Sequence, residues 1–350
     1  MRPTIKDVAK KAGVSISTVS LVMNDRPVSL SPETRAAVLE AAKELGYRPN
    51  QLAVGLVTKK TNTIGLIIPD NSNIFFAAYT NHLEAAANEL GYCLILGNSN
   101  GSPEKALHYL HLFADRGVDA IILAQSEFAD PEMTKKCLET VRSLRIPVLL
   151  IDRLFRTRSI EAVVLDHFEG GYLAARHLID LGHRRIGCLC GPLGLTSFQE
   201  RLAGFRQALE ECGIPYDPAL VAEGDLLVES AAAALPSLLR QKVSAIFAFN
   251  DMMAYGVYKE LYRLGIKIPE DISLIGFDDL FFSDVLQPPL TTVAQPLDKM
   301  ARAAMLRLSQ ILKDESAGEC LTQLFHPELK VRGSTSAPGK QFFERPANMK

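Results

Sequence analysis

The chain has 350 residues, of which 47% are hydrophobic, and its formal net charge at pH 7 is −2. This length permits two or three domains with sizeable cores. No run of 18 apolar residues occurs and polar residues recur from Arg2 onward, so we expect neither a membrane span nor a signal peptide. Six cysteines without CxxC spacing indicate reduced thiols and a cytoplasmic location.

The charge is distributed unevenly along the chain. Residues 1–60 contain ten Lys/Arg and five Asp/Glu, whereas the remaining residues contain 28 and 35. A basic N-terminal segment followed by an acidic body is typical of a polyanion-binding module joined to a separate domain. The N-terminal segment is therefore the first candidate for a contact with nucleic acid.

Residues 4–24 have the pattern of two short helices separated by a tight turn. The apolar face of the first helix consists of Ile5, Val8, Ala9 and Ala12. Thr4 and Asp7 have the spacing of a capping box at its start. Gly13 supplies the turn, and Ser15 is placed to cap the second helix.

In the second helix we expect Val19 and Met23 to face inward. The opposite face carries short polar or small apolar residues, namely Ser17, Thr18, Ser20, Leu21 and Asn24. Two helices at this spacing predict a helix-turn-helix whose second helix enters the DNA major groove. The alternative is an ordinary pair of packed helices.

A third helix is expected between Ser31, a suitable N-cap, and Gly46, which ends it. Its Ala37, Val38, Ala41 and Leu45 form a face that closes a three-helix domain of residues 1–47. Residues 48–61 follow. They include Gly55 and are short, so on physical grounds they form a marginal helix or a plain linker.

From Thr61 onward, short apolar strands alternate with amphipathic helices. This alternation predicts an α/β fold with parallel sheets covered on both faces. About nine strands are too many for one compact sheet, so we expect two doubly wound, Rossmann-like lobes within residues 62–335. Lobe 1 is expected to contain residues 62–161 and 294–324, and lobe 2 residues 162–290 and 325–335. Residues 336–350 form a polar tail.

Several polar and aromatic residues follow strand ends, where ligands of such sheets bind. They are Asn73, Phe75, Phe76, Asp152, Arg153, Phe198, Arg201, Asn250, Asp278 and Gln295. We expect helices to begin at Ala77 and Arg201, which leaves Phe75, Phe76 and Phe198 in loops. Carboxylates, amides, arginines and aromatic faces suit a polyhydroxylated ring. Taken singly, each is more commonly a helix cap or a loop residue.

The sequence gives little support to an enzyme or a metal centre. It contains no GxSxG, P-loop, GxGxxG or HExxH motif. His108 and His111 lack a third ligand nearby. Asp152 and Asp278 could form an acid–base pair, but nothing distinguishes their roles. We therefore expect no catalytic residues, no metal and no cofactor.

The motifs together identify a resemblance to the lac/galactose repressor family of bacterial transcription regulators, over residues 3 to 333. They are Thr4-Ile-Lys-Asp-Val-Ala, Gly13-Val-Ser, Thr18-Val-Ser, Arg48-Pro-Asn, Asn73-Ile-Phe-Phe, Arg201-Leu-Ala-Gly-Phe, Asn250-Asp-Met-Met-Ala and Ile275-Gly-Phe-Asp-Asp before Pro288-Pro-Leu-Thr-Thr. The resemblance implies an N-terminal helix-turn-helix head and a hinge helix, followed by two lobes of the periplasmic-binding-protein type. It also implies a cytoplasmic homodimer that binds double-stranded operator DNA and a small-molecule effector, with no membrane contact.

The resemblance assigns base reading to Ile16, Ser17 and Leu21. Many relatives carry a longer polar or basic residue where Leu21 stands, which suggests an apolar contact such as a thymine methyl group. It also makes residues 48–61 a hinge helix that folds on DNA, with Leu56 as a minor-groove wedge. The full set expected at the DNA is Thr4, Ser15, Ile16, Ser17, Thr18, Ser20, Leu21, Asn24, Asn50, Ala53 and Leu56.

The strand-end residues match positions that surround the sugar in ribose-binding relatives, which favours ribose or a similar pentose or furanose as the effector. A purine corepressor is the alternative, because Tyr92-Cys-Leu-Ile-Leu-Gly-Asn and Glu169-Gly-Gly-Tyr are similar to the purine repressor branch. Asn250 opposes it, because that branch has glycine there. A sugar-binding module without DNA function is a further alternative.

Overall fold

The structure is a computed structural model that describes residues 3–23, 30–48, 60–124, 130–152, 160–313 and 321–339. By its internal contacts the chain divides into two units, Met1–Thr61 and Asn62–Lys350. Of the residues expected at the DNA or the effector, Asn24, Asn50, Ala53, Leu56 and Arg153 lie outside the described residues. Most of the expected hinge helix lies outside them too.

The first unit contains three helices, α1 (Ile5–Ala12), α2 (Ile16–Met23) and α3 (Pro32–Leu45). Asp7 accepts a hydrogen bond from the Thr4 amide at 2.8 Å, and Ser15 Oγ accepts one from the Thr18 amide at 3.1 Å. Gly13 adopts the left-handed conformation at φ 66° that ends α1. These caps satisfy amides that a helix end leaves without partners, so they define two short helices.

The core of the first unit consists of Val8, Ala9, Val19, Val22, Val38, Ala41 and Ala42. Two details differ from the sequence-based expectation. Val22 is buried where we expected Met23, which is only partly buried against the core. Ala42 is buried and Ala37 is exposed, so the buried face of α3 consists of Val38, Ala41 and Ala42.

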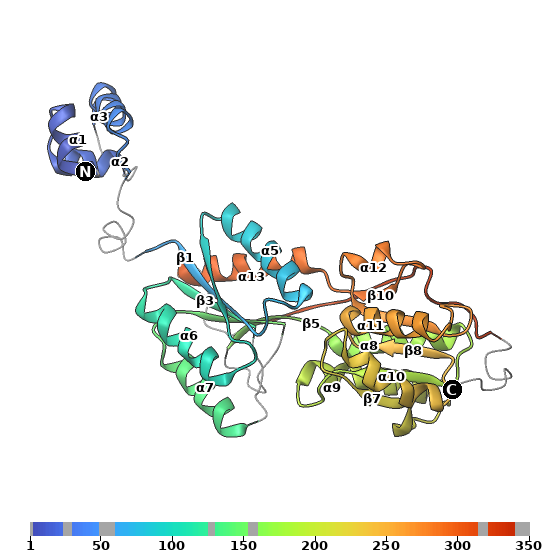
Figure 1. Cartoon of the computed structure of the whole chain (residues 1–350). Coiled ribbons are helices and arrows are strands. Elements are labelled where there is room, and N and C mark those ends of the chain that lie inside the picture. The colour runs from blue at the N-terminus through green and yellow to red at the C-terminus, as the bar shows by residue number, and fades with distance from the viewer. Residues whose placement is uncertain are drawn as a thin grey trace. The chain divides into compact units, whose positions relative to one another are not determined.

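The second unit contains two six-stranded sheets (Figure 1). The order in the first sheet is β11 (Thr322–Phe325), β5 (Glu161–Leu165), β4 (Val148–Ile151), β3 (Ala120–Leu123), β1 (Thr63–Ile68) and β2 (Cys93–Asn98). All of these pairs are parallel. The order in the second sheet is β12 (Glu328–Lys330), β10 (Thr291–Ala294), β9 (Ser273–Asp278), β8 (Ala245–Ala248), β6 (Ile186–Cys190) and β7 (Val221–Glu223). There only β12 is antiparallel to its neighbour.

Helices cover both faces of the first sheet (Figure 1). Ile64, Leu66 and Ile68 of β1 belong to the core formed with α5 (Ile74–Glu89) and α13 (Leu297–Leu312). Ile67 belongs to the core formed with α6 (Pro103–Asp115) and α7 (Pro131–Ser143). Successive strand residues point to opposite faces, so a strand buried on both sides is continuously apolar.

The helices of the second lobe are α8 (His167–Asp180), α9 (Thr196–Glu211), α10 (Ser230–Arg240), α11 (Asp251–Arg263) and the short α12 (Phe282–Val285). A 3-10 turn at Pro218–Leu220 precedes β7. From the sequence we expected no element at the positions of β7, β12 or α12. Each has only three or four residues, too few for a periodic pattern.

The chain crosses between the lobes at three places, after β5, after β10 and after β11. The expected boundary at residue 162 is wrong, because the strand at 161–165 pairs with β4 and β11 in the first sheet. Residues 291–294 pair with β9 in the second sheet. Residue 294, at which we expected the second segment of lobe 1 to begin, therefore belongs to lobe 2. An apolar strand sequence does not specify which sheet it joins, because both interiors are equally apolar.

Helices α8 and α9 pack with their backbones in close approach. A Cβ atom added at Gly171 would overlap the Arg201 carbonyl oxygen, and one added at Gly204 would overlap the Phe168 carbonyl oxygen. Only glycine permits this distance on both helices. The contact therefore fixes the positions of Phe168 on α8 and Arg201 on α9.

We predict that Gly204→Ala destabilises the protein. Ala for Gly inside a helix ordinarily stabilises by about 0.5–1 kcal/mol, but here the added methyl group meets backbone and forces the helices apart. Overpacking of this kind costs about 1–3 kcal/mol. The melting temperature should fall, whereas Gly194→Ala, where an added Cβ meets nothing within 4 Å, serves as the control. An unchanged melting temperature for Gly204→Ala would contradict the close approach.

Candidate functional site

The expected DNA-reading face of the first unit lies on α2 and its N-terminal turn. Ile16 is 45% exposed, and Ser17 is exposed beside it. Leu21, about one turn of helix after Ser17, is half-buried. Thr4 and Ser15 are exposed, and Thr18 and Ser20 are half-buried. Every described residue that we expected at the DNA is therefore at least partly accessible.

In the second unit, one cavity brings together every described residue that we expected to contact the effector. Its lining residues are Asn73, Phe75, Phe76, Asp152, Ser197, Phe198, Arg201, Leu226, Asn250, Asp278 and Gln295. We call it the effector cavity, after the residues that we expected to contact the effector. Its residues follow strands of both sheets at their carboxyl ends, where doubly wound sheets bind ligands. Ser197 and Leu226 were not expected from the sequence.

Two helices begin earlier than expected and bring the aromatic residues into the effector cavity. Asn73 caps α5, its Oδ1 accepting from the Phe75 amide at 3.0 Å, so Phe75 and Phe76 are helical and not in a loop. Helix α9 begins at Thr196, so Phe198 is helical too. The rings of Phe75 and Phe76 meet edge to face at 5.0 Å between centroids. The aromatic walls are therefore held by regular structure.

Arg201 occupies the centre of the effector cavity and is only 4% exposed. Its guanidinium group lies over the Phe277 ring at 3.5 Å from the centroid and donates to the Phe249 carbonyl oxygen. An Nη atom also lies 3.9 Å from the Asp278 carboxylate. Burying an arginine without partners is costly, so these contacts compensate for its lost hydration.

His167 is a further hydrogen-bond partner of Arg201, which we did not expect from the sequence. Its Nδ1 accepts from Arg201 Nε at 3.2 Å, and its Nε2 lies 3.3 Å from the Asp152 carbonyl oxygen. Because Arg201 can only donate, the ring hydrogen must be on Nε2, which donates to Asp152. His167 thus joins the end of β4 to α9. His167 lies directly after the point where the chain crosses from the first lobe to the second. Its position could have been inferred only by knowing that residues 161–165 belong to the first sheet.

Asp278 and Gln295 form the other polar wall. Gln295 Nε2 donates to Asp278 Oδ1 at 2.7 Å, whereas Gln295 Oε1 is buried without a hydrogen-bond partner among the described residues. Burial raises the pKa of the Asp278 carboxyl to about 8, although the nearby Arg201 guanidinium lowers it. The cavity therefore offers one unpaired acceptor and one carboxyl group whose charge is poorly solvated.

Backbone strain is concentrated at the same carboxylates. Asp152 has φ 63° and Asp278 has φ 111°, both in the region that favours glycine. Such conformations cost about 1–3 kcal/mol each and persist where the surrounding structure determines them. Their presence at both carboxylates of the effector cavity is typical of a functional site.

Asp251 holds the second-lobe wall of the effector cavity without lining it. It is fully buried and accepts hydrogen bonds from the Leu280 amide at 2.9 Å, Ser283 Oγ at 2.5 Å and Thr292 Oγ1 at 2.7 Å. Burial raises its pKa to about 6, and these hydrogen bonds oppose the rise. Asp251 thereby joins the ends of β8, β9 and β10, which carry Asn250, Asp278 and Gln295.

The asparagines have structural roles in addition to their exposure to the effector cavity. Asn250 caps α11, its Oδ1 accepting from the Met253 amide at 2.9 Å, and its Nδ2 donates to the Leu226 carbonyl oxygen at 3.0 Å. Each of these atoms can make one more hydrogen bond.

The effector cavity has a free volume of about 30 Å³, so a ring-sized ligand requires the lobes or Arg201 to move.

One group of possible metal ligands lies nearby among the described residues. The ligating atoms of Asp166, Glu169 and His326 lie within 4.8 Å of one another, with His326 Nδ1 2.5 Å from Glu169. His326 is 70% exposed, and Asp166 already caps α8 by accepting from the Glu169 amide. No further feature of these residues indicates an ion. No described helix is both long and apolar enough to span a membrane.

Comparisons with known proteins cover both units. Residues 4–50 match the family model of bacterial regulatory proteins, lacI family, and residues 175–335 match a periplasmic binding protein-like domain. The chain is 38% identical over 337 residues to the HTH-type transcriptional regulator DegA of Bacillus subtilis (strain 168), covering 96% of this chain and 99% of the relative. It is 34% identical over 333 residues to the HTH-type transcriptional repressor PurR of Aliivibrio salmonicida (strain LFI1238), covering 95% and 98%.

Solved structures give the same result. A lac repressor dimer bound to operator and the anti-inducer ONPF superposes with a TM-score of 0.85 at 27% identity, covering 96% of this chain and all of the other. A LacI family regulator from Enterococcus faecium with bound ribose has a TM-score of 0.70 at 28% identity, covering 79% and 99%. The relatives are transcriptional regulators and not enzymes.

The raised pKa of Asp278 predicts a pH dependence of stability. A carboxyl group whose pKa is 3.8 in the unfolded chain and about 8 in the folded protein favours folding most below pH 3.8. Its contribution is lost as the pH rises toward 8. The melting temperature of the wild type should therefore fall relative to that of Asp278→Asn between pH 5 and pH 8. Asp115→Asn, at an exposed carboxylate, is the control, and parallel wild-type and Asp278→Asn profiles would contradict the assignment.

Proposed function

The chain belongs to the LacI family of bacterial regulatory proteins and is a DNA-binding transcriptional regulator with an effector-binding domain, and from this premise we propose that it is a sugar-controlled repressor. The proposed effector is ribose or a closely similar pentose or furanose, bound in the effector cavity. Such a regulator acts in the cytoplasm, where its operator is.

The observation that carries the sugar proposal is the combination of groups around Arg201. Asp278 and Gln295 Oε1 can accept hydrogen bonds from a ligand, and Arg201 can donate them to it. A sugar ring offers hydroxyl groups to both kinds of partner and C–H faces to the rings of Phe76 and Phe198. Gln295 Oε1 supports this further, because a buried acceptor without a partner is costly unless a ligand donor reaches it. The ribose-bound relative supports the choice of ring.

A purine corepressor is the second candidate, since relatives at 34–36% identity are purine repressors by name. The amide of Asn250 and the two acceptors on the same wall, Asp278 and Gln295 Oε1, favour hydroxyl groups over a purine ring. A sugar-binding module without DNA function is disfavoured by the match of residues 4–50 to the lacI family model.

We propose that the sugar acts by changing the relation between the lobes. Gln295 and His167 both lie at chain crossings, and Arg201 connects to Asp152 through His167. A ligand that contacts Gln295 and Arg201 therefore binds best at one lobe arrangement. In the proposed mechanism this arrangement unfolds the hinge helices of residues 48–61 and releases the operator.

The proposed regulator is a homodimer, because a pseudo-palindromic operator requires two heads. Two apolar surfaces of the second unit suit this role. Phe281, Phe282 and Val285 are 76%, 47% and 58% exposed around α12. Ile95 and Leu96 are 39% and 40% exposed on β2, the edge strand of the first sheet. Exposed apolar residues on an edge strand commonly mark an interface.

Calorimetric titration of the full chain with D-ribose tests the effector. We expect saturable heat, and we expect Asp278→Asn to weaken binding by about tenfold, the loss of one hydrogen bond to the ligand. Asp115→Asn is the matched control. Absence of heat with every pentose, together with binding of hypoxanthine or guanine, would replace the sugar by the purine corepressor.

Operator binding tests the hinge assignment, which rests on the family resemblance. In gel shifts on the DNA upstream of its own gene, Leu56→Gly should weaken binding by tenfold or more, because it removes the wedge and weakens the helix. Ribose affinity should not change. Gln51→Gly has a similar cost in helix propensity and should weaken DNA binding less. Equal operator affinity for Leu56→Gly and the wild type would show that Leu56 is not the wedge.

A further inference from the structure

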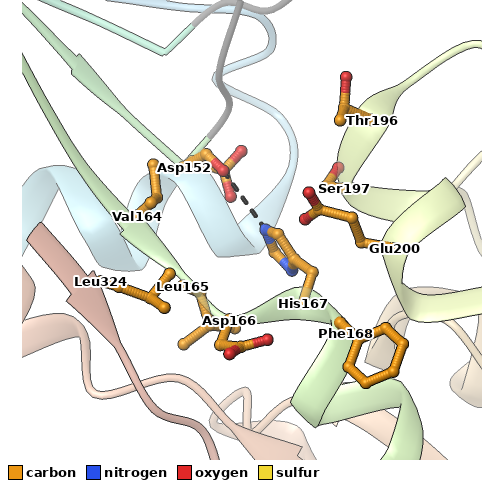
Figure 2. Close-up of a pocket in the computed structure, with 10 residues that line it drawn as sticks. All are labelled: Asp152, Val164, Leu165, Asp166, His167, Phe168, Thr196, Ser197, Glu200 and Leu324. Atoms are coloured by element: carbon orange, nitrogen blue, oxygen red, sulfur yellow. Dashed lines mark hydrogen bonds between the residues drawn. The ribbon is translucent and has the colours of Figure 1, made fainter. Parts of the chain in front are cut away.

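A larger cavity adjoins the effector cavity and shares Asp152 and Ser197 with it. Its volume is about 360 Å³, within the range of small-molecule sites. Figure 2 shows its lining, which comes from the crossing after β5, the start of α9 and β11. The residues are Asp152, Val164, Leu165, Asp166, His167, Phe168, Thr196, Ser197, Glu200 and Leu324. We call it the second cavity.

The second cavity has an apolar part and an acidic part. Val164, Leu165 and Leu324 form its apolar wall, and Phe168, which is 43% exposed, lies at its rim. Leu324 is 51% exposed, although it is on a strand paired in the sheet. Apolar side chains together with one aromatic ring suit the faces of a planar ring.

Hydrogen-bond acceptors line the other part. The Glu200 carboxyl group faces the space from α9, opposite Asp152, and receives no hydrogen bond from a described residue (Figure 2). Asp166 already accepts from the Glu169 amide at 2.8 Å, and it retains a second oxygen. Burial raises the pKa of Glu200 and the Asp166 carboxylate raises it further, whereas the Arg201 guanidinium group lowers it. A ligand part with N–H donors would satisfy these carboxyl groups.

The same carboxyl groups oppose a negatively charged ligand. Among the described residues, the lining of the second cavity contains neither lysine nor arginine. A phosphate group there would lie near the Glu200 and Asp166 carboxyl groups, whose negative charge would repel it. The fitting substituent is therefore uncharged, planar and edged with N–H groups.

We propose that the effector is a ribonucleoside, with its ribose in the effector cavity and its base in the second cavity. The inference rests on the proposed sugar function and extends it. Asp152 and Ser197, which border both cavities, lie where the sugar and the base would be joined. The base places its faces against Leu324 and Phe168 and its N–H edge toward Glu200.

Calorimetry on the full chain compares D-ribose, hypoxanthine, inosine, adenosine, cytidine, uridine and inosine 5′-monophosphate. At least one nucleoside should bind ten times more tightly than ribose and than hypoxanthine, and the monophosphate should bind more weakly than inosine. If ribose binds and no nucleoside exceeds it, or if the monophosphate exceeds inosine, the inference is wrong while the sugar proposal stands. If neither ribose nor any nucleoside binds, both are wrong.

Two variants locate the base. Leu324→Trp fills the second cavity, and Phe168→Ala removes the aromatic surface at its rim. Each should reduce nucleoside affinity by about tenfold and leave ribose affinity within twofold. Leu324→Trp does so by occupying the space of the base, and Phe168→Ala by removing a stacking partner. Leu321→Trp, at a 45% exposed residue next to β11 that does not line the cavity, is the matched control. Unchanged nucleoside affinity in both variants, with normal ribose binding, would place the base elsewhere and overturn the proposal.

Discussion

The burial of the Arg201 guanidinium group is the constraint on which the second unit depends. A permanently charged group in a nearly dry interior must find partners for its donors, because the desolvation cost otherwise exceeds what one residue can contribute to stability. Those partners come from separate elements: Phe249 after β8, Asp278 at the end of β9, and His167 at the crossing after β5. Arg201 therefore requires the ends of these strands to meet at one place, and the close contact of α8 with α9 supplies the position from which it reaches them.

In the proposed function, this arrangement links ligand binding to the relation between the lobes. His167 joins Arg201 to the backbone of Asp152, and Gln295 precedes the crossing into α13. In the described part of the chain, the covalent connections that a change of lobe arrangement bends are these three crossings. A ligand held by Arg201, Asp278 and Gln295 therefore acts on groups beside those crossings, and its binding energy differs between lobe arrangements. That difference is what a conformational switch requires.

Most of the fold could be predicted from the sequence, because strands buried on both faces and capped helices have local signals. Thr4 with Asp7, Ser15 and Gly13 specify the head, and Ile64 to Ile68 specify a central strand. The effector cavity could be anticipated because side chains after parallel strands converge at one edge. What could not be predicted depends on non-local pairing. The sheet that residues 161–165 join is decided by β4 and β11, and with it the place of His167. The helical position of Phe198 depends on a helix that begins without a side-chain cap.

Asp278 shows how the same residues make the effector cavity responsive. Its left-handed backbone and raised pKa are both unfavourable to the isolated protein, and both arise because the surrounding strands fix the carboxyl group in a buried position. Hydrogen bonds from ligand hydroxyl groups stabilise the ionised form of a carboxyl group and thereby lower its pKa. Ligand binding and ionisation of Asp278 are consequently linked, and a ligand with donors relieves a cost that folding alone leaves in place. A ligand without donors relieves none of it, which gives the cavity a physical basis for preferring polyhydroxylated molecules over apolar ones of the same size.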